Sequence, residues 1–220
     1  MRPFLTLFLA CSLFGVALAG DIQGTITIKS RVPPRAVGPK RVRIGQNYPD
    51  RDGGKPCAPV DEALFAVVFL CDPSGRLKAS PETDPDEYPT MRQKGTEFLP
   101  HVLPVVSGST VRFTNEDDIY HHIYSPGGFE IPKYKGRERT QKFDKPGAVE
   151  IFCGIHPRMN AYILVTENDY FANVDSEHRF RLRDVPPGRY TLRVWHPRLK
   201  AVERAVEVPA GGTLTVDLTL

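Results

Sequence analysis

The order of hydrophobic and polar positions predicts short β-strands along almost the whole chain. Residues 22–29 alternate between apolar and polar side chains, and residues 64–70 form a continuous apolar run that is typical of a buried strand. No stretch of ten residues follows the period of a helix. Further runs of strand character cover residues 98–106, 110–115, 148–152, 161–165, 178–183, 189–195, 201–208 and 213–218. The pattern therefore predicts an all-β fold built from β-sandwiches.

Composition and charge limit the class of protein. The chain has 220 residues, of which 40% are hydrophobic, and its 29 lysines and arginines against 26 aspartates and glutamates give a net charge of +3. A balance this even argues against nucleic acid as a partner. Residues 31–43 and 72–89 combine prolines with many charged side chains, so we interpret them as connectors.

The first 19 residues have the composition of a secretory signal peptide. Arg2 is followed by an apolar run from Phe4 to Leu18, and Ala17-Leu18-Ala19 has the small-x-small pattern that signal peptidase recognises. We expect cleavage after Ala19 and export to a periplasm or an equivalent compartment. No later segment has the roughly 20 apolar residues of a spanning helix, so no membrane span is predicted.

Export changes the interpretation of the cysteines, because disulfides form in oxidising compartments. Apart from Cys11 in the predicted signal peptide, the chain has Cys57, Cys71 and Cys153. Cys57 and Cys71 could close a disulfide loop of roughly 15 residues, worth about 3 kcal/mol in the chain-entropy description, or both could be small buried residues. Either alternative leaves Cys153 over, and its unpaired thiol indicates separate chemistry.

The candidate chemistry lies between residues 121 and 159. Cys153, His156 and Met159 follow one another at intervals of three, and His121 and His122 stand upstream at the end of another strand pattern. A thiolate and two imidazoles can hold an ion in a trigonal plane, with a methionine sulfur bound weakly on the axis. Soft sulfur suits Cu(I) and imidazole suits both copper states, so one rigid site can exchange a single electron. Zinc is the alternative metal, but a thioether is a poor zinc ligand.

This stretch resembles the copper-binding segment of the cupredoxins, the blue-copper proteins. The order Cys153-x2-His156-x2-Met159 is most similar to amicyanins. In plastocyanin-like members a Phe-x-Asn strand end leads to the first histidine ligand six residues after the asparagine, a spacing that Asn115 and His121 share. The resemblance implies a Greek-key β-sandwich with one type 1 copper ion held by His121, Cys153, His156 and Met159.

The resemblance covers residues 98–165 and has two departures beside the site. The family commonly has asparagine after the first histidine ligand, where this chain has His122. We expect the ring of His122 either to tie the two ligand-bearing loops together or to be exposed and titrate, with its backbone N–H within reach of the Cys153 sulfur. Proline often precedes the second histidine, where this chain has Ile155. Because an N–H bond from Ile155 would weaken thiolate donation to Cu(II), we expect a higher reduction potential than for Ile155→Pro.

The C-terminal part, through residues 170–180 and 185–194, resembles the back half of carboxypeptidase regulatory-like domains. These are transthyretin-like β-sandwiches with a structural or interaction role. The resemblance implies that residues 20–80 and 167–220 are the two halves of one sandwich, and that residues 81–166 are a copper domain inserted between them. The alternative is a cupredoxin with long extensions at both ends.

Other aromatic and histidine residues are expected to be structural. His101 lies at the start of a predicted strand, and Trp195 is expected to pack in the second sandwich rather than to carry electrons. His178 and His196 fit ordinary surface or strand positions.

No enzyme signature accompanies the copper motif. The sequence has no Cys-x-x-Cys-His, no Gly-x-Ser-x-Gly and no His-Glu-x-x-His. We therefore expect a non-enzymatic, exported blue copper protein that carries single electrons between redox protein partners, which the sequence does not identify. The alternative is a copper-binding carrier or sensor module whose sandwich recruits a partner. The oligomeric state is left open.

Overall fold

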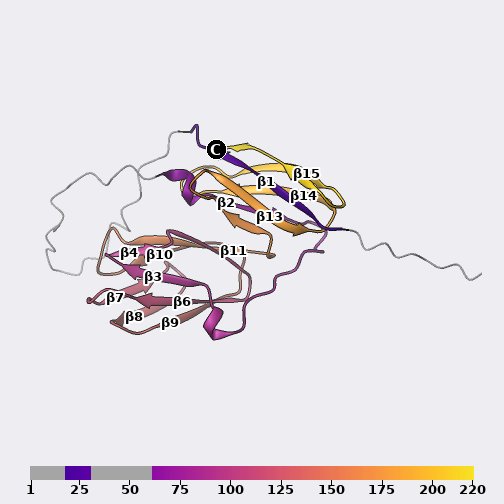
Figure 1. Ribbon diagram of the computed structural model, residues 1–220. Helices are drawn as coiled ribbons and strands as arrows, with labels where there is room; N and C mark the ends of the chain where they lie inside the picture. The colour runs from indigo at the N-terminus through magenta and orange to yellow at the C-terminus, as the bar shows by residue number, and fades with distance from the viewer. Residues whose placement is uncertain (1–17, 31–60) are drawn as a thin grey trace, which may run out of the picture.

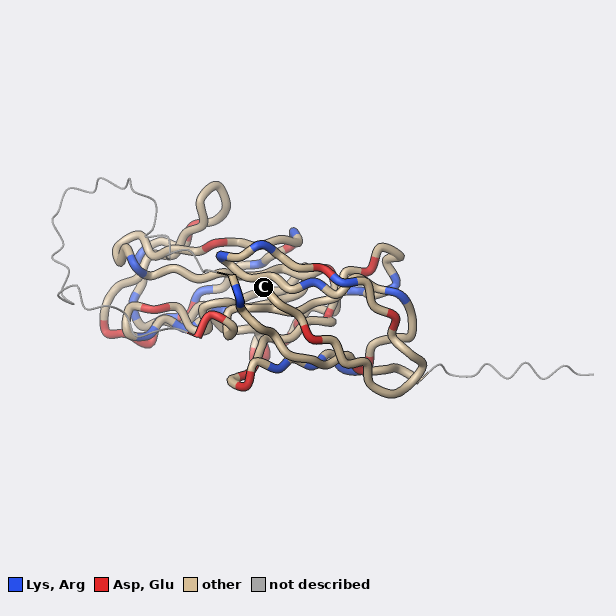
Figure 2. Tube along the Cα trace, turned by 90° about the horizontal axis from the view of Figure 1, so that it is seen from above, with Lys and Arg blue, Asp and Glu red and all other residues tan. Residues whose placement is uncertain are grey.

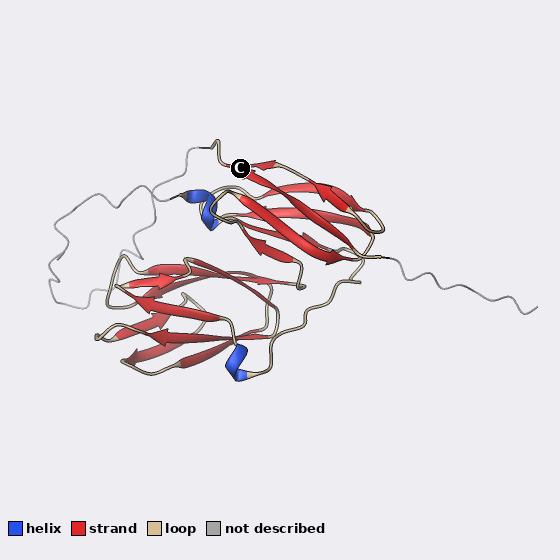
Figure 3. Ribbon diagram, in the orientation of Figure 1, coloured by secondary structure: helices blue, strands red, loops and turns tan. Residues whose placement is uncertain are grey.

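The computed structural model describes residues 18–30 and 61–220. These residues form β-strands with only two short 3-10 helices among them (Figure 1, Figure 3). The strands make four sheets, which pack in pairs around two separate hydrophobic cores. The predicted all-β class and its β-sandwich architecture are thereby confirmed.

The middle sandwich takes its strands from the middle of the chain. Its sheets have the strand orders β4-β3-β6-β9 and β5-β11-β10-β7-β8. Phe113, Ile123 and Ile163 are completely buried between them, as expected where alternate residues of each strand face the opposite sheet. The strands are β3 (Thr90–Lys94), β4 (Glu97–Leu99), β5 (Val102–Val106), β6 (Ser109–Asn115), β7 (His121–Tyr124), β8 (Glu130–Tyr134), β9 (Arg139–Phe143), β10 (Gly147–Cys153) and β11 (Asn160–Thr166).

The split sandwich takes its strands from both sides of the middle sandwich. One sheet has the order β13-β1-β16, with β17 also paired to β1, and the other has the order β12-β2-β14-β15. Its core includes the fully buried Ile22, Leu192 and Val194. The strands are β1 (Gly20–Thr27), β2 (Val67–Cys71), β12 (Phe171–Asn173), β13 (Arg179–Val185), β14 (Gly188–Trp195), β15 (Val202–Val208), β16 (Thr213–Thr215) and β17 (Leu218–Thr219).

β2, the last strand before the middle sandwich in the sequence, and β12, the first strand after it, are neighbours in space. β2 and β12 pair antiparallel, with Val67 opposite Asn173, so the chain leaves and re-enters the split sandwich at adjacent strands. Figure 1 shows both ends of its colour scale, indigo and yellow, in the split sandwich. The exact domain boundaries, including a division at residues 81 and 166, stay a prediction.

The sandwiches touch through the outward faces of one sheet from each. Val67 of β2 packs with Val102 of β5 and Leu164 of β11 in a small apolar cluster. Trp195 packs against this cluster and not against the core of the split sandwich, so the prediction that it packs within its own sandwich is wrong. The physical reason is alternation along β14, which points Trp195 outward, edge-on to Tyr162 with 5.7 Å between ring centroids.

Most predicted strands are present, but two differ in kind. Residues 64–70 begin within a 3-10 helix, η1 (Glu62–Phe65), because the Asp61 carboxylate caps it by accepting from the Ala63 N–H. Residues 98–106 are divided between β4 and β5. The pattern also did not predict β3, β7, β8, β9 and β12; β9, for example, buries only Phe143. The second 3-10 helix, η2 (Pro85–Glu87), lies in a predicted connector.

Some predictions lie outside the described residues. Most of the predicted signal peptide is among them, as is Cys57, so its disulfide with Cys71 stays a prediction. Within the described ranges, no helix is long and apolar enough to span a membrane. Figure 2 shows acidic and basic positions interspersed along both sandwiches, in line with the balanced composition.

Candidate metal centre

Three of the predicted ligands meet at one end of the middle sandwich. Cys153 is the last residue of β10 and His121 the first of β7. These strands are neighbours, with Cys153 opposite Ile123, so sheet pairing joins residues 32 positions apart. His156 lies in the metal loop, residues 154–159, which connects β10 to β11.

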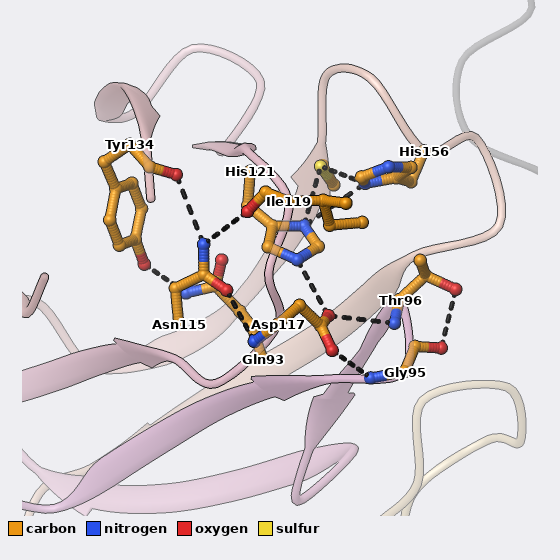
Figure 4. A network of polar contacts seen from close by, with 10 residues as sticks. Gln93, Gly95, Thr96, Asn115, Asp117, Ile119, His121, Tyr134 and His156 are labelled. Atoms are coloured by element: carbon orange, nitrogen blue, oxygen red, sulfur yellow. Dashed lines mark hydrogen bonds and ion pairs between the residues drawn. The ribbon is translucent and has the colours of Figure 1, made fainter. Parts of the chain in front are cut away.

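The three donor atoms form a compact triangle (Figure 4). Cys153 Sγ lies 3.7 Å from His121 Nδ1 and 3.4 Å from His156 Nδ1, and the two nitrogens are 3.2 Å apart. An ion bonded to nitrogen at about 2.0 Å and to sulfur at about 2.3 Å can bridge atoms at such separations. In the described part of the chain, these residues are the one group of His, Cys, Asp and Glu side chains arranged to share an ion.

The Cys153 thiol is buried and surrounded by backbone N–H groups. Burial raises the pKa of Cys153 because it disfavours the charged thiolate. The N–H groups of His122, Ile155 and His156 donate toward the sulfur and oppose this effect. The N–H groups of His122 and Ile155 are the two donors considered from the sequence. A bound metal ion supplies the positive charge that deprotonates a coordinating thiol.

Met159 closes the metal loop. Its side chain is 1% exposed and packs in the same core cluster as Cys153. The Cys153 N–H donates to the Met159 carbonyl at 2.9 Å, and the Met159 N–H donates to the His156 carbonyl at 3.0 Å. These two bonds make the loop a tight turn that returns the chain to Cys153.

The ring of His121 is fixed by an aspartate that was not predicted from the sequence. His121 is fully buried, and its Nε2 lies 2.9 Å from the Asp117 carboxylate. The same carboxylate accepts from the N–H of Gly95 at 2.7 Å and from that of Thr96 at 3.1 Å (Figure 4). This contact favours the tautomer with its proton on Nε2, which leaves the Nδ1 lone pair directed at the triangle.

Asp117 is held in its charged form. Burial alone would raise the pKa of Asp117, but the N–H groups of Gly95 and Thr96 and the His121 ring outweigh burial and hold it below its usual range. Its position four residues before His121 was a signal for this role. That signal was ambiguous, because Glu116 and Asp118 flank Asp117 and spacing does not tell which acid faces the ring.

Asn115 shapes the turn between β6 and β7. Its side-chain amide donates to the carbonyl of Ile119 at 2.9 Å and to that of Tyr134 at 3.2 Å. Its oxygen accepts from the Asp117 N–H at 3.0 Å. Asn115 thereby fixes the turn from which both Asp117 and His121 extend.

A buried tyrosine completes the network in Figure 4. Gln93 is fully buried and its amide donates to the Tyr134 hydroxyl. Burial raises the pKa of Tyr134 to about 12 and outweighs the opposing effects of the Gln93 hydrogen bond and of Arg139. Tyr134 therefore stays neutral and adds no charge beside the triangle.

The ring of His122 turns away from the triangle. Its Nε2 lies 2.8 Å from Glu130 Oε1, and the ring packs on Gly154, where an added Cβ would come within 2.3 Å of His122 Nδ1. The two ligand-bearing segments are tied by backbone instead, since the Gly154 N–H donates to the His122 carbonyl at 2.8 Å. The tie between the two loops, one of the two roles expected for the His122 ring, is therefore made by the main chain.

His156 is the least buried member of the triangle. Burial lowers the pKa of His156, and the neighbouring His121 acts in the same direction. Both effects favour the neutral imidazole, whose lone pair is free to bind a metal ion.

The remaining described histidines lie elsewhere. His101 packs against aromatic rings between the sandwiches, in line with a structural role. His178 is exposed, with its Nε2 2.7 Å from Asp61. His196 is only 2% exposed, and its Nε2 lies 3.1 Å from the Glu62 carbonyl, so it is not a surface residue.

A family model for the carboxypeptidase regulatory-like domain matches residues 156–220, less than a third of the chain. The match confirms the C-terminal resemblance. It begins inside the metal loop and includes β11 of the middle sandwich. No curated protein matches the chain.

Solved cupredoxin structures are similar to part of the chain. A purple cupredoxin from Nitrosopumilus maritimus is 23% identical, and the match covers 36% of this chain and 99% of the cupredoxin with a TM-score of 0.34. A reduced Cu(I) form of an amicyanin variant is 21% identical, with 45% of this chain and 98% of amicyanin covered and a TM-score of 0.36. Both proteins are cupredoxins, the class that the Cys153-x2-His156-x2-Met159 motif resembles.

Proposed function

We propose that this protein carries single electrons by binding one type 1 copper ion through His121, Cys153, His156 and Met159. The observation that carries the proposal is the triangle of donor atoms, whose three separations lie between 3.2 and 3.7 Å. One thiolate and two imidazoles with a nearby thioether are the donor set of copper electron-transfer sites. Bound copper would supply one electron by cycling between Cu(I) and Cu(II).

The protein's contribution is to keep the donors in place. His121, Cys153 and Met159 are 0%, 5% and 1% exposed, so three of the four side chains are shielded from water. Asp117 fixes the His121 ring, and backbone N–H groups surround the Cys153 sulfur. Ligands held this firmly change position little when the charge of the site changes, which favours electron exchange over bond chemistry.

Location and partner are further parts of the proposal. We infer that the chain is exported to a periplasm or similar compartment and cleaved after Ala19. In support, β1 begins at Gly20, so cleavage there leaves the first strand whole. The partner would be another redox protein, which meets the site at His156, the least buried ligand.

Cu(II) loading of the purified protein, followed by visible spectroscopy and redox cycling, tests the proposal. We expect an intense thiolate-to-Cu(II) charge-transfer band that disappears on reduction and returns on oxidation. Cys153→Ser should lose the band. Cys71→Ser is the matched control, because it removes the other described thiol and leaves the triangle intact, and it should stay coloured.

Two results would count against electron transfer. A colourless protein that binds only Cu(I) would favour the copper carrier or sensor. A band that survives in Cys153→Ser would mean that the copper is bound elsewhere.

A further inference from the structure

Aromatic rings from both sandwiches meet beside the strand that follows the metal loop. Phe65 and Trp195 come from the split sandwich, and His101 and Tyr162 from the middle sandwich. The ring centroids are 4.5 Å apart for Phe65 and His101, 5.6 Å for His101 and Tyr162, and 5.7 Å for Tyr162 and Trp195. All three contacts are tilted or edge-on, as aromatic pairs prefer. We call these four residues the aromatic bridge.

The bridge holds Tyr162 close to the metal loop. β11 begins at Asn160, directly after Met159, so Tyr162 is the third residue of the strand. Its N–H donates to the His101 carbonyl at 2.9 Å. Its hydroxyl donates to Glu150 Oε1 on β10 at 2.8 Å. Tyr162 is therefore held by its backbone, its hydroxyl and its ring at once.

The strands that Tyr162 connects lie on either side of two of the predicted ligands, Cys153 and Met159. β10 ends at Cys153, and β11 starts after Met159. The loop between them is closed by the bond from the Cys153 N–H to the Met159 carbonyl. A shift of Tyr162 would move the start of β11 against β10, and with it Met159 against Cys153.

We propose that the split sandwich braces the metal loop through the aromatic bridge, with Tyr162 as the positioning residue. Phe65 and Trp195 press from one sandwich on His101 and Tyr162 of the other, and β11 transmits this constraint to Met159. The link to copper rests on the proposed function, whereas the brace concerns only contacts within the chain.

Amide hydrogen exchange of the full metal-free chain tests the brace. Trp195→Leu removes the ring that contacts Tyr162 but keeps an apolar side chain. We expect the amides of Cys153 and Met159, which close the loop, to exchange roughly tenfold faster. Phe69→Leu is the matched control. Phe69 packs in the same interface cluster but has no ring contact with the bridge among the described residues, so loop exchange should match the wild type.

Phe65→Leu is a second variant in case Trp195→Leu does not fold, and it should accelerate loop exchange in the same direction. Wild-type exchange at the loop in both variants would overturn the brace. So would equal acceleration in Phe69→Leu, because the effect would then belong to the whole interface.

Copper loading separates the brace from the proposed function. We expect the charge-transfer band of Trp195→Leu to shift relative to the wild type, since the position of Met159 changes. If the copper-loaded wild type shows no band, the proposed function is wrong, but the exchange result still tests the brace. If the wild type is coloured and its variants exchange at the wild-type rate, only the brace is wrong.

Discussion

Replacing Asp117 by asparagine should weaken the metal centre without altering a ligand. Asparagine has the same size, but it is uncharged and has an NH2 group in place of one oxygen. The Asp117 carboxylate accepts from Gly95, Thr96 and His121 with both of its oxygens. In the variant, the asparagine NH2 group therefore faces at least one of these three donor groups, and a hydrogen bond is lost there.

The expected size of the effect follows from these bonds. A hydrogen bond to a charged group contributes about 1.5–3 kcal/mol, and a buried donor left without an acceptor costs about 1–3 kcal/mol. With Asp117 only 16% exposed, we expect the metal-free variant to lose about 2–3 kcal/mol of unfolding free energy. Metal affinity should fall by roughly 10–100-fold, as for other groups that orient a ligating histidine.

The effect should depend on pH in a defined direction. The folded-state pKa of Asp117 lies below its unfolded value, so its stabilisation is complete above about pH 4 and is lost as the pH falls through the folded-state pKa. The difference in stability between wild type and Asp117→Asn should be largest at neutral pH and shrink in acid.

Urea unfolding of the metal-free protein from pH 7 down to pH 3 measures this difference. Asp118→Asn is the matched control, because Asp118 is 98% exposed and, among the residues that the structure describes, forms an ion pair only with the surface Lys135, so its midpoint should equal that of the wild type. If Asp117→Asn unfolds at the wild-type urea concentration, or if Asp118→Asn is equally affected, the carboxylate does not fix His121 as argued.

Two further substitutions test the surroundings of Cys153. Ile155→Pro removes one N–H donor to the sulfur and should lower the reduction potential of the copper-loaded protein, as measured by voltammetry; an unchanged potential would contradict this. Gly154→Ala places a Cβ 2.3 Å from His122 Nδ1 and should destabilise the protein by about 1–3 kcal/mol in urea. Gly128→Ala, where the nearest atom is 3.3 Å away, should cost less, and equal costs would show that the His122 contact is unimportant.

The fold class could be predicted because each sandwich core leaves a periodic trace in the sequence. Strands with several buried positions, such as residues 110–115, alternate clearly. β9 buries only Phe143, and a strand with a single inward residue has no pattern to detect. The outward direction of Trp195 was missed for a related reason: alternation marks two faces of a strand, but the sequence does not tell which face meets another sheet.

From the residues alone, the sequence predicted only the part of the candidate site that lies in one short segment. The spacing of Cys153, His156 and Met159 is local, and the position of His121 came from a resemblance. Asp117 was not found, because its role depends on the N–H groups of Gly95 and Thr96, which reach it from another part of the sheet. Tyr162 was likewise invisible, since its neighbours come from both sandwiches.

The pairing of β1 also determines the order in which this chain can fold. Gly20 pairs with Val185, and Asp21 pairs with Thr213, so the first described strand finds its neighbours only after most of the chain has been synthesised. The middle sandwich closes through much shorter loops and can form first. Until the later strands of the split sandwich have been synthesised, β1 and β2 have no strand partners, and unpaired apolar strands of this kind aggregate. A chaperone that shelters them should therefore raise the yield of native protein.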